Sequence, residues 1–140
     1  MKLLRRLPHA MEHPQSESQQ NSAAGAADLH DLREALRRFS AERDWDQFHT
    51  PKNLAMALSV EVSELLEHFQ WLTAEQSASL DTDTRQQVRE ELADVLLYLV
   101  RLADRLDVDL LVAAKEKMVR NAEKYPVEKA RGSSRKYTEL

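Results

Sequence analysis

The 140-residue chain is long enough to bury a core as one domain, and with only 6% aromatic residues that core must be mainly aliphatic. Two glycines and four prolines are too few for a loop-rich or β-rich protein, so we expect an all-α chain. A net charge of −4 argues against non-specific binding to nucleic-acid polymers. No apolar run is long enough to span a membrane.

The absence of cysteine excludes disulfides and thiolate metal sites and fits the reducing cytoplasm, where we expect the protein to be located. Residues 1–27 are expected to form a disordered tail, because the polar run 15–27 has no bulky apolar side chain to bury. Pro8 follows the basic, apolar first residues too soon for a signal-peptide core, and Met11 is an alternative start. The folded domain is expected to be 28–140.

The hydrophobic periodicity predicts four helices, over residues 28–42, 51–70, 84–106 and 110–124. Thr50 and Pro51 give the second helix a capping residue and a first-turn proline, and Asp109 caps the fourth. Residues 73–83 form a polar connection, and Pro126 is expected to end regular structure. The remaining residues form a flexible basic tail with a Gly-Ser-Ser hinge. Four antiparallel helices with short connections favour a four-helix bundle.

Two pairs of acidic residues lie beside the strongest apolar stripes. Glu61 and Glu64 are one turn apart in the second helix, and Glu91 and Asp94 repeat the spacing in the third. If these helices pack side by side, the four carboxylates converge, and such a set of oxygen ligands suits Mg²⁺. The alternative is that each pair belongs to a solvated or salt-bridged helix face. The apolar stripe of the second helix comprises Leu54, Leu58, Val62, Leu65 and Phe69, and that of the third comprises Val88, Leu92, Val95, Leu96, Leu99, Ala103 and Leu106.

Aromatic residues lie at both ends of the second helix. Trp45 and Trp71 could hold a flat base by stacking, or they could close the end of the bundle. His49 could hydrogen-bond the edge of the base or face solvent. Tyr98, one turn beyond Asp94, could contact a ligand or be a core tyrosine.

The C-terminal segment is basic. From Lys115 to the end of the chain there are eight Lys and Arg residues and four acidic residues. The cations could favour the dipole of a helix C-terminus or bind a triphosphate. The residues of interest are Lys117, Asn121 and Lys124 on one helix face, followed by Arg131, Arg135 and Lys136.

The sequence resembles the dCTP pyrophosphatase family, which belongs to the MazG-type all-α nucleoside triphosphate pyrophosphohydrolases. The resemblance covers about residues 28–140. It is carried by Arg43-Asp-Trp-Asp-Gln-Phe-His49, Glu61-Val-x-Glu64-Leu, Phe69-Gln-Trp71, Glu90-Glu-Leu-x-Asp94-Val-Leu-x-Tyr98, Lys117-Met, Asn121-x-x-Lys124-Tyr-Pro-Val and Arg131-Gly-Ser-Ser-Arg-Lys-Tyr.

This resemblance implies that Glu61, Glu64, Glu91 and Asp94 hold Mg²⁺ and that Trp45 and Trp71 border the base pocket. It also implies that Tyr98, Lys117 and Asn121 contact the nucleotide, and that the protein forms a homodimer or homotetramer with sites across the subunit contact. Leu36 is a departure, because animal relatives often carry a histidine there. The base preference is therefore open.

We expect a Mg²⁺-dependent four-helix enzyme that hydrolyses a (deoxy)nucleoside triphosphate, dCTP or a modified dCTP, to the monophosphate and pyrophosphate. One of the four carboxylates would accept the proton of the attacking water. Lys117, Lys124, Arg131, Arg135 and Lys136 would neutralise charge on the pyrophosphate. The alternatives are a nucleotide sensor without turnover and a helical oligomerisation module. The number of metal ions and the attacked phosphorus stay open.

Overall fold

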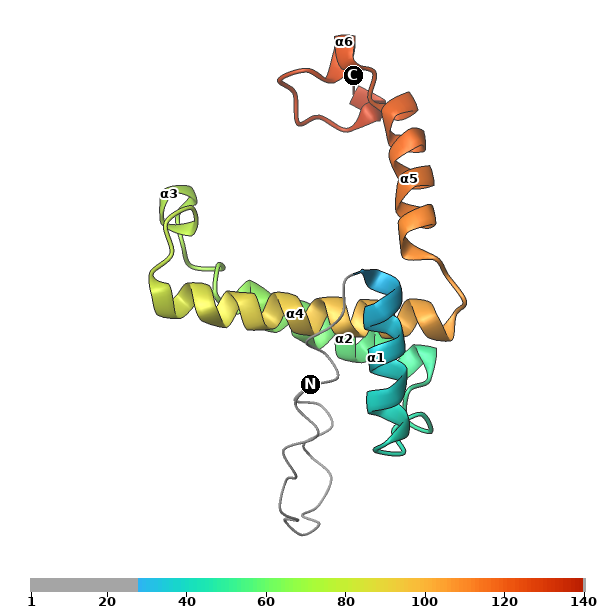
Figure 1. The fold of residues 1–140 in the computed structure, drawn as a ribbon. Helices are drawn as coiled ribbons and strands as arrows, with labels where there is room; N and C mark the ends of the chain where they lie inside the picture. The colour runs from blue at the N-terminus through green and yellow to red at the C-terminus, as the bar shows by residue number, and fades with distance from the viewer. Residues whose placement is uncertain (1–27, 140) are drawn as a thin grey trace. The chain divides into compact units, whose positions relative to one another are not determined.

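The computed structural model describes residues 28–139, and every regular element in this range is helical (Figure 1). The all-α prediction is therefore confirmed, whereas the predicted tail 1–27 lies outside the described residues. The helices are α1 Leu29–Ala41, α2 Pro51–Glu67, α3 Ala74–Ser77, α4 Thr82–Arg105, α5 Leu110–Lys124 and α6 Val127–Ala130, followed by the 3₁₀ turn η3 Tyr137–Glu139. The chain divides after Leu106 into two compact units, which are described separately.

The long helices begin where side-chain oxygens cap free backbone N–H groups. Thr50 accepts a hydrogen bond from the N–H of Asn53 at the start of α2, and Asp109 caps α5 in the same way. Both predicted caps are confirmed. The helix α4 starts two residues earlier than predicted, because Asp81 accepts from the N–H of Thr84 and so caps a helix that begins at Thr82.

The first unit is built on the pairing of α2 with α4, which run in opposite directions, and α1 packs against α4 (Figure 1). Leu54 and Ala57 of α2 are buried against Tyr98 of α4, with Leu58 and Leu102 packed around them. This small aliphatic core holds α2 and α4 together, and the two helices carry the acidic pairs.

The buried faces differ from the predicted stripes. In α2, Val62 is 47% exposed, whereas Glu61 is 0% exposed and follows Leu54 and Ala57 on one helical face. In α4, Tyr98 and Arg101 are buried, although neither belongs to the predicted stripe. Four members of that stripe are exposed in the single chain, Leu92, Leu96, Leu99 and Leu106.

Two short elements contradict the predicted irregular segments. The helix α3 lies in the expected polar connection and is stabilised by a capping box, in which Thr73 and Gln76 satisfy each other's backbone N–H groups. The helix α6 follows Pro126, so the prediction that Pro126 ends regular structure is wrong. Proline lacks only its own N–H and is therefore compatible with a position that precedes a helix.

The second unit contains α5, α6 and η3. The rings of Tyr125 and Tyr137 meet edge to face with centroids 6.0 Å apart, and Lys124 Nζ lies 5.1 Å from the Tyr137 ring centroid. These contacts fold the end of the chain back onto the end of α5. Gly132 has φ +73°, a left-handed conformation that allows the chain to turn between α6 and η3. No helix among residues 28–139 is long and apolar enough to cross a lipid bilayer.

Candidate active site

Three glutamates meet between α2 and α4. One carboxylate oxygen from each of Glu61, Glu64 and Glu91 lies within 4.8 Å of the others. Glu61 is fully buried, and the other two are half-buried. Glu61 and Glu64 are one turn apart on α2, and the pairing of the helices brings Glu91 to them. Like charges this close repel each other and are costly to desolvate, so the arrangement favours a bound cation.

Asp94 is not a member of this group of three. It is half-buried and lies one turn beyond Glu91 on α4, toward Tyr98. Burial raises the pKa of Tyr98 to about 12, and the charges of Glu61 and Asp94 add to the shift. The tyrosine is therefore protonated at neutral pH. Its hydroxyl is buried and has no hydrogen-bond partner among residues 28–139.

The donor set fits a divalent cation. All of its members are carboxylates, which are hard oxygen ligands of the kind that Mg²⁺ and Ca²⁺ take. Glu61, Glu64 and Glu91 could hold such an ion, and Asp94 is close enough in sequence to complete or support the set.

Trp45 and His49 of the loop before α2 form an aromatic group with Phe39 of α1. The Trp45 and His49 rings meet edge to face at 6.2 Å between centroids, and those of Phe39 and Trp45 at 5.7 Å. His49 is buried in this group. The side chain of Arg43 lies over the Phe39 ring, with its guanidinium carbon 3.6 Å from the ring centroid.

Trp71 follows the C-terminal end of α2 and is 86% exposed, so the two tryptophans lie at opposite ends of that helix. A helix of 17 residues is about 25 Å long at its usual rise of ~1.5 Å per residue. One chain therefore does not place both indoles on one base.

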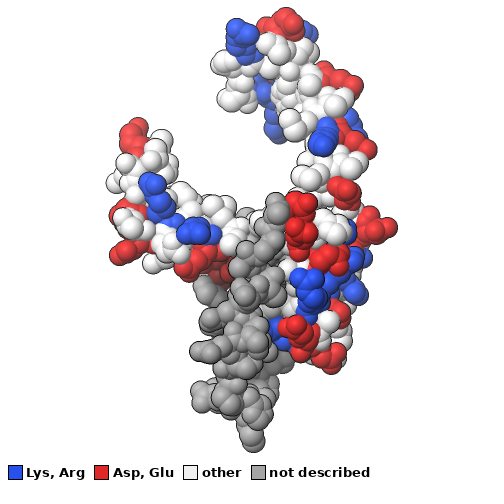
Figure 2. Space-filling model, in the orientation of Figure 1, with Lys and Arg blue, Asp and Glu red and all other residues white. Residues whose placement is uncertain are grey.

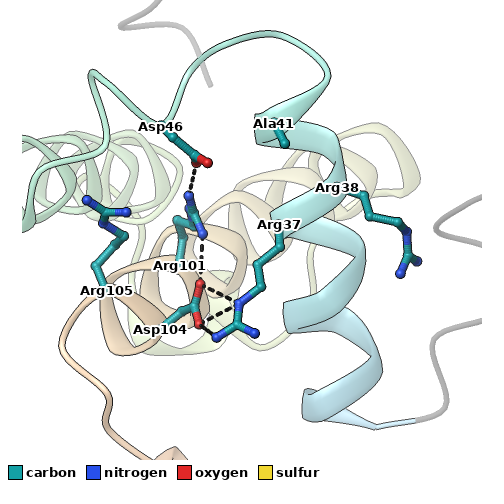
Figure 3. A pocket seen from close by; sticks show the side chains of 7 residues that line it. All are labelled: Arg37, Arg38, Ala41, Asp46, Arg101, Asp104 and Arg105. Atoms are coloured by element: carbon teal, nitrogen blue, oxygen red, sulfur yellow. Dashed lines mark hydrogen bonds and ion pairs between the residues drawn. The ribbon is translucent and has the colours of Figure 1, made fainter.

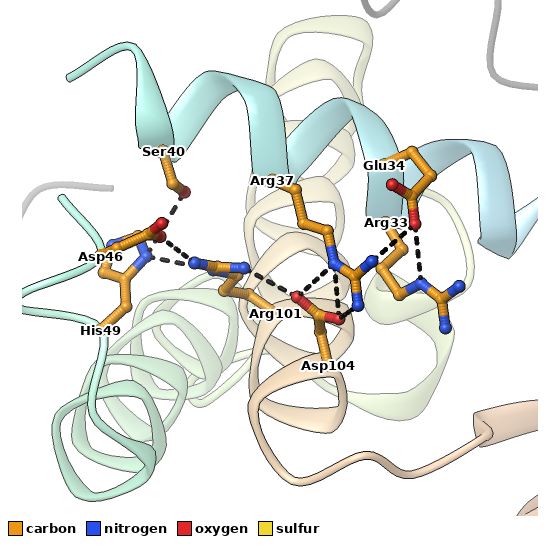
Figure 4. A network of polar contacts seen from close by, with 8 residues as sticks. All are labelled: Arg33, Glu34, Arg37, Ser40, Asp46, His49, Arg101 and Asp104. Atoms are coloured by element: carbon orange, nitrogen blue, oxygen red, sulfur yellow. Dashed lines mark hydrogen bonds and ion pairs between the residues drawn. The ribbon is translucent and has the colours of Figure 1, made fainter. Parts of the chain in front are cut away.

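A polar network joins α1, α4 and the loop before α2 (Figure 4). Arg101 is buried, and each of its three guanidinium nitrogens has a partner. Nε donates to His49 Nδ1 at 3.3 Å, Nη1 donates to Asp104 at 2.7 Å, and Nη2 donates to Asp46. Arg37 of α1 also donates to Asp104, from Nε at 2.9 Å. The Arg101 guanidinium is consequently fixed in one orientation.

Four residues of this network, Arg37, Asp46, Arg101 and Asp104, line a surface pocket of about 490 Å³ (Figure 3). Basic and acidic side chains lie side by side over this part of the molecule (Figure 2). Within the pocket, Asp46 and Asp104 bind Arg101, and Asp104 also binds Arg37. The two carboxylates thus offset half of the positive charge of the four arginines that line the pocket.

The sequence-based interpretation missed Arg101 and its partners. One signal was present, since Arg101 lies one turn beyond Tyr98 within an otherwise apolar run of α4. The partners come from distant segments, and no spacing rule connects them.

The predicted phosphate-binding residues belong to the second unit. Lys117, Asn121 and Lys124 lie on α5, and Arg131, Arg135 and Lys136 follow α6. Arg135 lines a surface cavity of about 580 Å³ together with Lys129, Ser133 and Ser134. Their role toward a nucleotide remains a prediction.

The fold and the site define an all-α protein with an acidic cluster between two antiparallel helices. Residues 56–140 match the model of the MazG-like family. Human dCTP pyrophosphatase 1 is 51% identical over 114 residues, covering 80% of this chain and 67% of that protein, and the rat protein of the same name is 48% identical. The crystal structure of a pyrophosphatase from Archaeoglobus fulgidus matches 84% of this chain and 99% of its own with a TM-score of 0.67 and 36% identity.

The chain belongs to the MazG-like family. The predicted resemblance to dCTP pyrophosphatases is confirmed.

Proposed function

We propose that the protein is a nucleoside triphosphate pyrophosphohydrolase that converts dCTP, or a modified dCTP, and water to the monophosphate and pyrophosphate. The observation that carries this proposal is the convergence of Glu61, Glu64 and Glu91 in a chain 51% identical to dCTP pyrophosphatase 1. The sensor without turnover is not favoured, because the relatives are named as pyrophosphatases. The oligomerisation module does not account for a buried acidic cluster.

We infer that the cation is Mg²⁺ and that the three glutamates hold it with Asp94. When bound, a divalent cation supplies charge that polarises phosphate oxygens and increases the acidity of water. The protein's own carboxylates then have two roles. They would hold the cation, and one of them would accept the proton of the attacking water. Attack at the α- or at the β-phosphorus gives the same two products.

The basic residues of the second unit are proposed to bind the phosphates. Lys117 and Lys124 of α5, with Arg131, Arg135 and Lys136, would neutralise the charge that develops on the departing pyrophosphate. Asn121 lies between the two lysines, where its amide could donate a hydrogen bond to the same oxygens.

Base binding is proposed to require a second copy of the chain. Trp45 and Trp71 lie at opposite ends of α2, so a base held between them would contact Trp71 of another copy. Large apolar side chains of α2 and α4 are exposed in the single chain, which is unusual for a monomer. They include Met56, Val62, Leu66, Leu92 and Leu96. We therefore propose a homodimer or homotetramer, located in the cytoplasm as the cysteine-free sequence allows.

The proposal is tested by incubating the purified protein with dCTP, dTTP, dATP and dGTP, each with and without Mg²⁺, and measuring released pyrophosphate. We expect Mg²⁺-dependent release, highest for dCTP. If the protein binds nucleotide but none of these incubations releases pyrophosphate, the protein is instead a sensor.

A further inference from the structure

The contact between Arg101 and His49 fixes which imidazole nitrogen carries the proton. The arginine Nε–H can only donate, and it lies 3.3 Å from His49 Nδ1. That nitrogen must therefore act as the acceptor, and the neutral ring carries its hydrogen on Nε2. Ser40 Oγ, 3.4 Å from the same Nδ1, is compatible with this assignment because a hydroxyl can also donate.

The charges around His49 also favour the neutral ring. Burial lowers the pKa of His49 below its usual 6.5, and the nearby cation of Arg101 lowers it further. Asp46 in the preceding loop raises this pKa, and Arg105 of α4 lowers it. The neighbouring α1 contributes the uncharged Ser40.

The Nε2–H of His49 is left over as a hydrogen-bond donor. This nitrogen is buried, and it has no partner among the residues that the structure describes. Buried polar groups in proteins are nearly always satisfied, so such a donor indicates a missing acceptor. His49 lies beside a small cavity of about 20 Å³, which is also lined by Leu36, Phe39, Leu97, Tyr98 and Arg101.

We propose that Arg101 is a positioning residue, whose Nε–H holds His49 Nδ1 as an acceptor so that the buried Nε2–H is offered to an acceptor on the substrate's base. This inference rests on the proposed function, and it explains how the same site would select the base of its substrate. A base stacked on Trp45 comes beside His49, because the two rings are already in edge contact. Cytosine offers its N3 and O2 as adjacent acceptors, whereas N3 of thymine carries a proton. O2 is an acceptor in both bases, so a donor directed at N3 favours cytosine over thymine.

The protonation state is tested first, without turnover, by ¹⁵N NMR of histidine-labelled protein across a pH titration. His49→Gln identifies the resonances that belong to His49. In the wild type we expect an unprotonated Nδ1, a protonated Nε2 and a pKa below 6.5. A neutral ring with its proton on Nδ1 would overturn the proposal.

Two substitutions should move the pKa of His49 in opposite directions. Arg101→Met removes a cation that opposes protonation, so the pKa should rise. Asp46→Asn removes an anion that favours protonation, so the pKa should fall. Arg37→Gln is the matched control, since it disturbs the bond to Asp104 without touching His49. Should Arg101→Met fail to fold, the tautomer of His49 in the wild type still decides, and shifts of the same sign in both variants would contradict the proposal.

Kinetics test the role in base selection. In Arg101→Met, the ratio of kcat/KM for dCTP to that for dTTP should fall roughly tenfold, as expected for one buried hydrogen bond. An unchanged ratio in an active Arg101→Met variant would refute this inference and leave the pyrophosphohydrolase intact. If the wild type hydrolyses no nucleotide, the proposed function fails, and the NMR result alone decides the tautomer.

Discussion

Glu61 combines a charge with complete burial. It occupies the face of α2 that also buries Leu54 and Ala57, and it meets Glu64 and Glu91 across the helix pair. A carboxylate in this position is costly to desolvate, and its neighbours carry the same sign of charge. We therefore expect its main contribution to be to cation binding and catalysis, with little or none to stability.

Glu61→Gln should lower the rate of dCTP hydrolysis by roughly 10²- to 10⁴-fold, the range for a group that transfers or directs a proton. The melting temperature without metal should hold or rise, because the substitution removes like-charge repulsion. Glu90→Gln is the control, since Glu90 is exposed and accepts a hydrogen bond from Gln86. Steady-state kinetics and thermal melts decide the result. A Glu61→Gln variant as active as Glu90→Gln would remove the acidic cluster from the mechanism.

Asp104 stabilises the contact between α1 and α4. Its side chain is 5% exposed and binds Arg37 of α1 and Arg101 of α4. Burial alone would raise the pKa of Asp104, but the two arginines outweigh it and lower the pKa below the usual 3.8. The carboxylate therefore contributes stability above the unfolded-state pKa, and this stability is lost as the pH falls through the folded-state value.

Asp104→Asn should lower the free energy of unfolding by about 2 kcal/mol near neutral pH, because the buried Arg101 loses one of its two carboxylate partners and keeps only Asp46. Urea unfolding of wild type and variant across a pH series measures this difference. The difference should be constant between about pH 5 and 7 and should shrink as the pH falls below the usual aspartate value. A difference that grows on acidification would show that the carboxylate does not act through its charge.

At the scale of elements, the long helices were readable from the sequence because their signals are local. Thr50, Pro51 and Asp109 mark helix starts by their own chemistry. The Thr73–Gln76 capping box was also present in the sequence, but the polar composition around it concealed α3. The buried faces of α2 and α4 were less readable, since periodicity shows which residues share a face and not what covers that face.

The C-terminal segment combines order with positive charge. Tyr137 packs on Tyr125, so the basic residues from Arg131 to Lys136 form a loop anchored at both ends. Truncation after Ala130 should lower kcat/KM for dCTP and dTTP in parallel, roughly tenfold or more, because it removes cations that would contact phosphates. Tyr137→Ala keeps these cations and separates lost packing from lost charge. Selective loss for one base after truncation would place the segment at the base instead.

At the scale of the whole molecule, contacts between segments that are distant in the sequence could not be predicted. The Arg101 network joins residues of α1, α4 and the loop before α2, and local patterns do not encode which of them meet. The convergence of the glutamates was predictable only on the condition that α2 and α4 pack together. The clustering of Glu61, Glu64 and Glu91 fulfils that condition.

A site that needs two copies of the chain can be tested by complementation. Glu61→Gln keeps Trp71, and Trp71→Ala keeps the acidic cluster, so a mixed dimer contains one intact site. Co-expression of the two inactive or weakened variants should restore activity to about a quarter of wild type, because half of the dimers are mixed and each has one working site. If the mixture is no more active than the average of the two variants, each site lies within one chain.

The central claim is that this chain cleaves dCTP to dCMP and pyrophosphate through the glutamate cluster between α2 and α4. The most direct measurement is a ³¹P NMR time course of dCTP and Mg²⁺ with wild-type protein and, in parallel, with Glu61→Gln. The account predicts that dCMP and pyrophosphate appear together with the wild type and that the variant leaves dCTP intact. Formation of dCDP and orthophosphate, unchanged dCTP with the wild type, or equal turnover by the variant would contradict it.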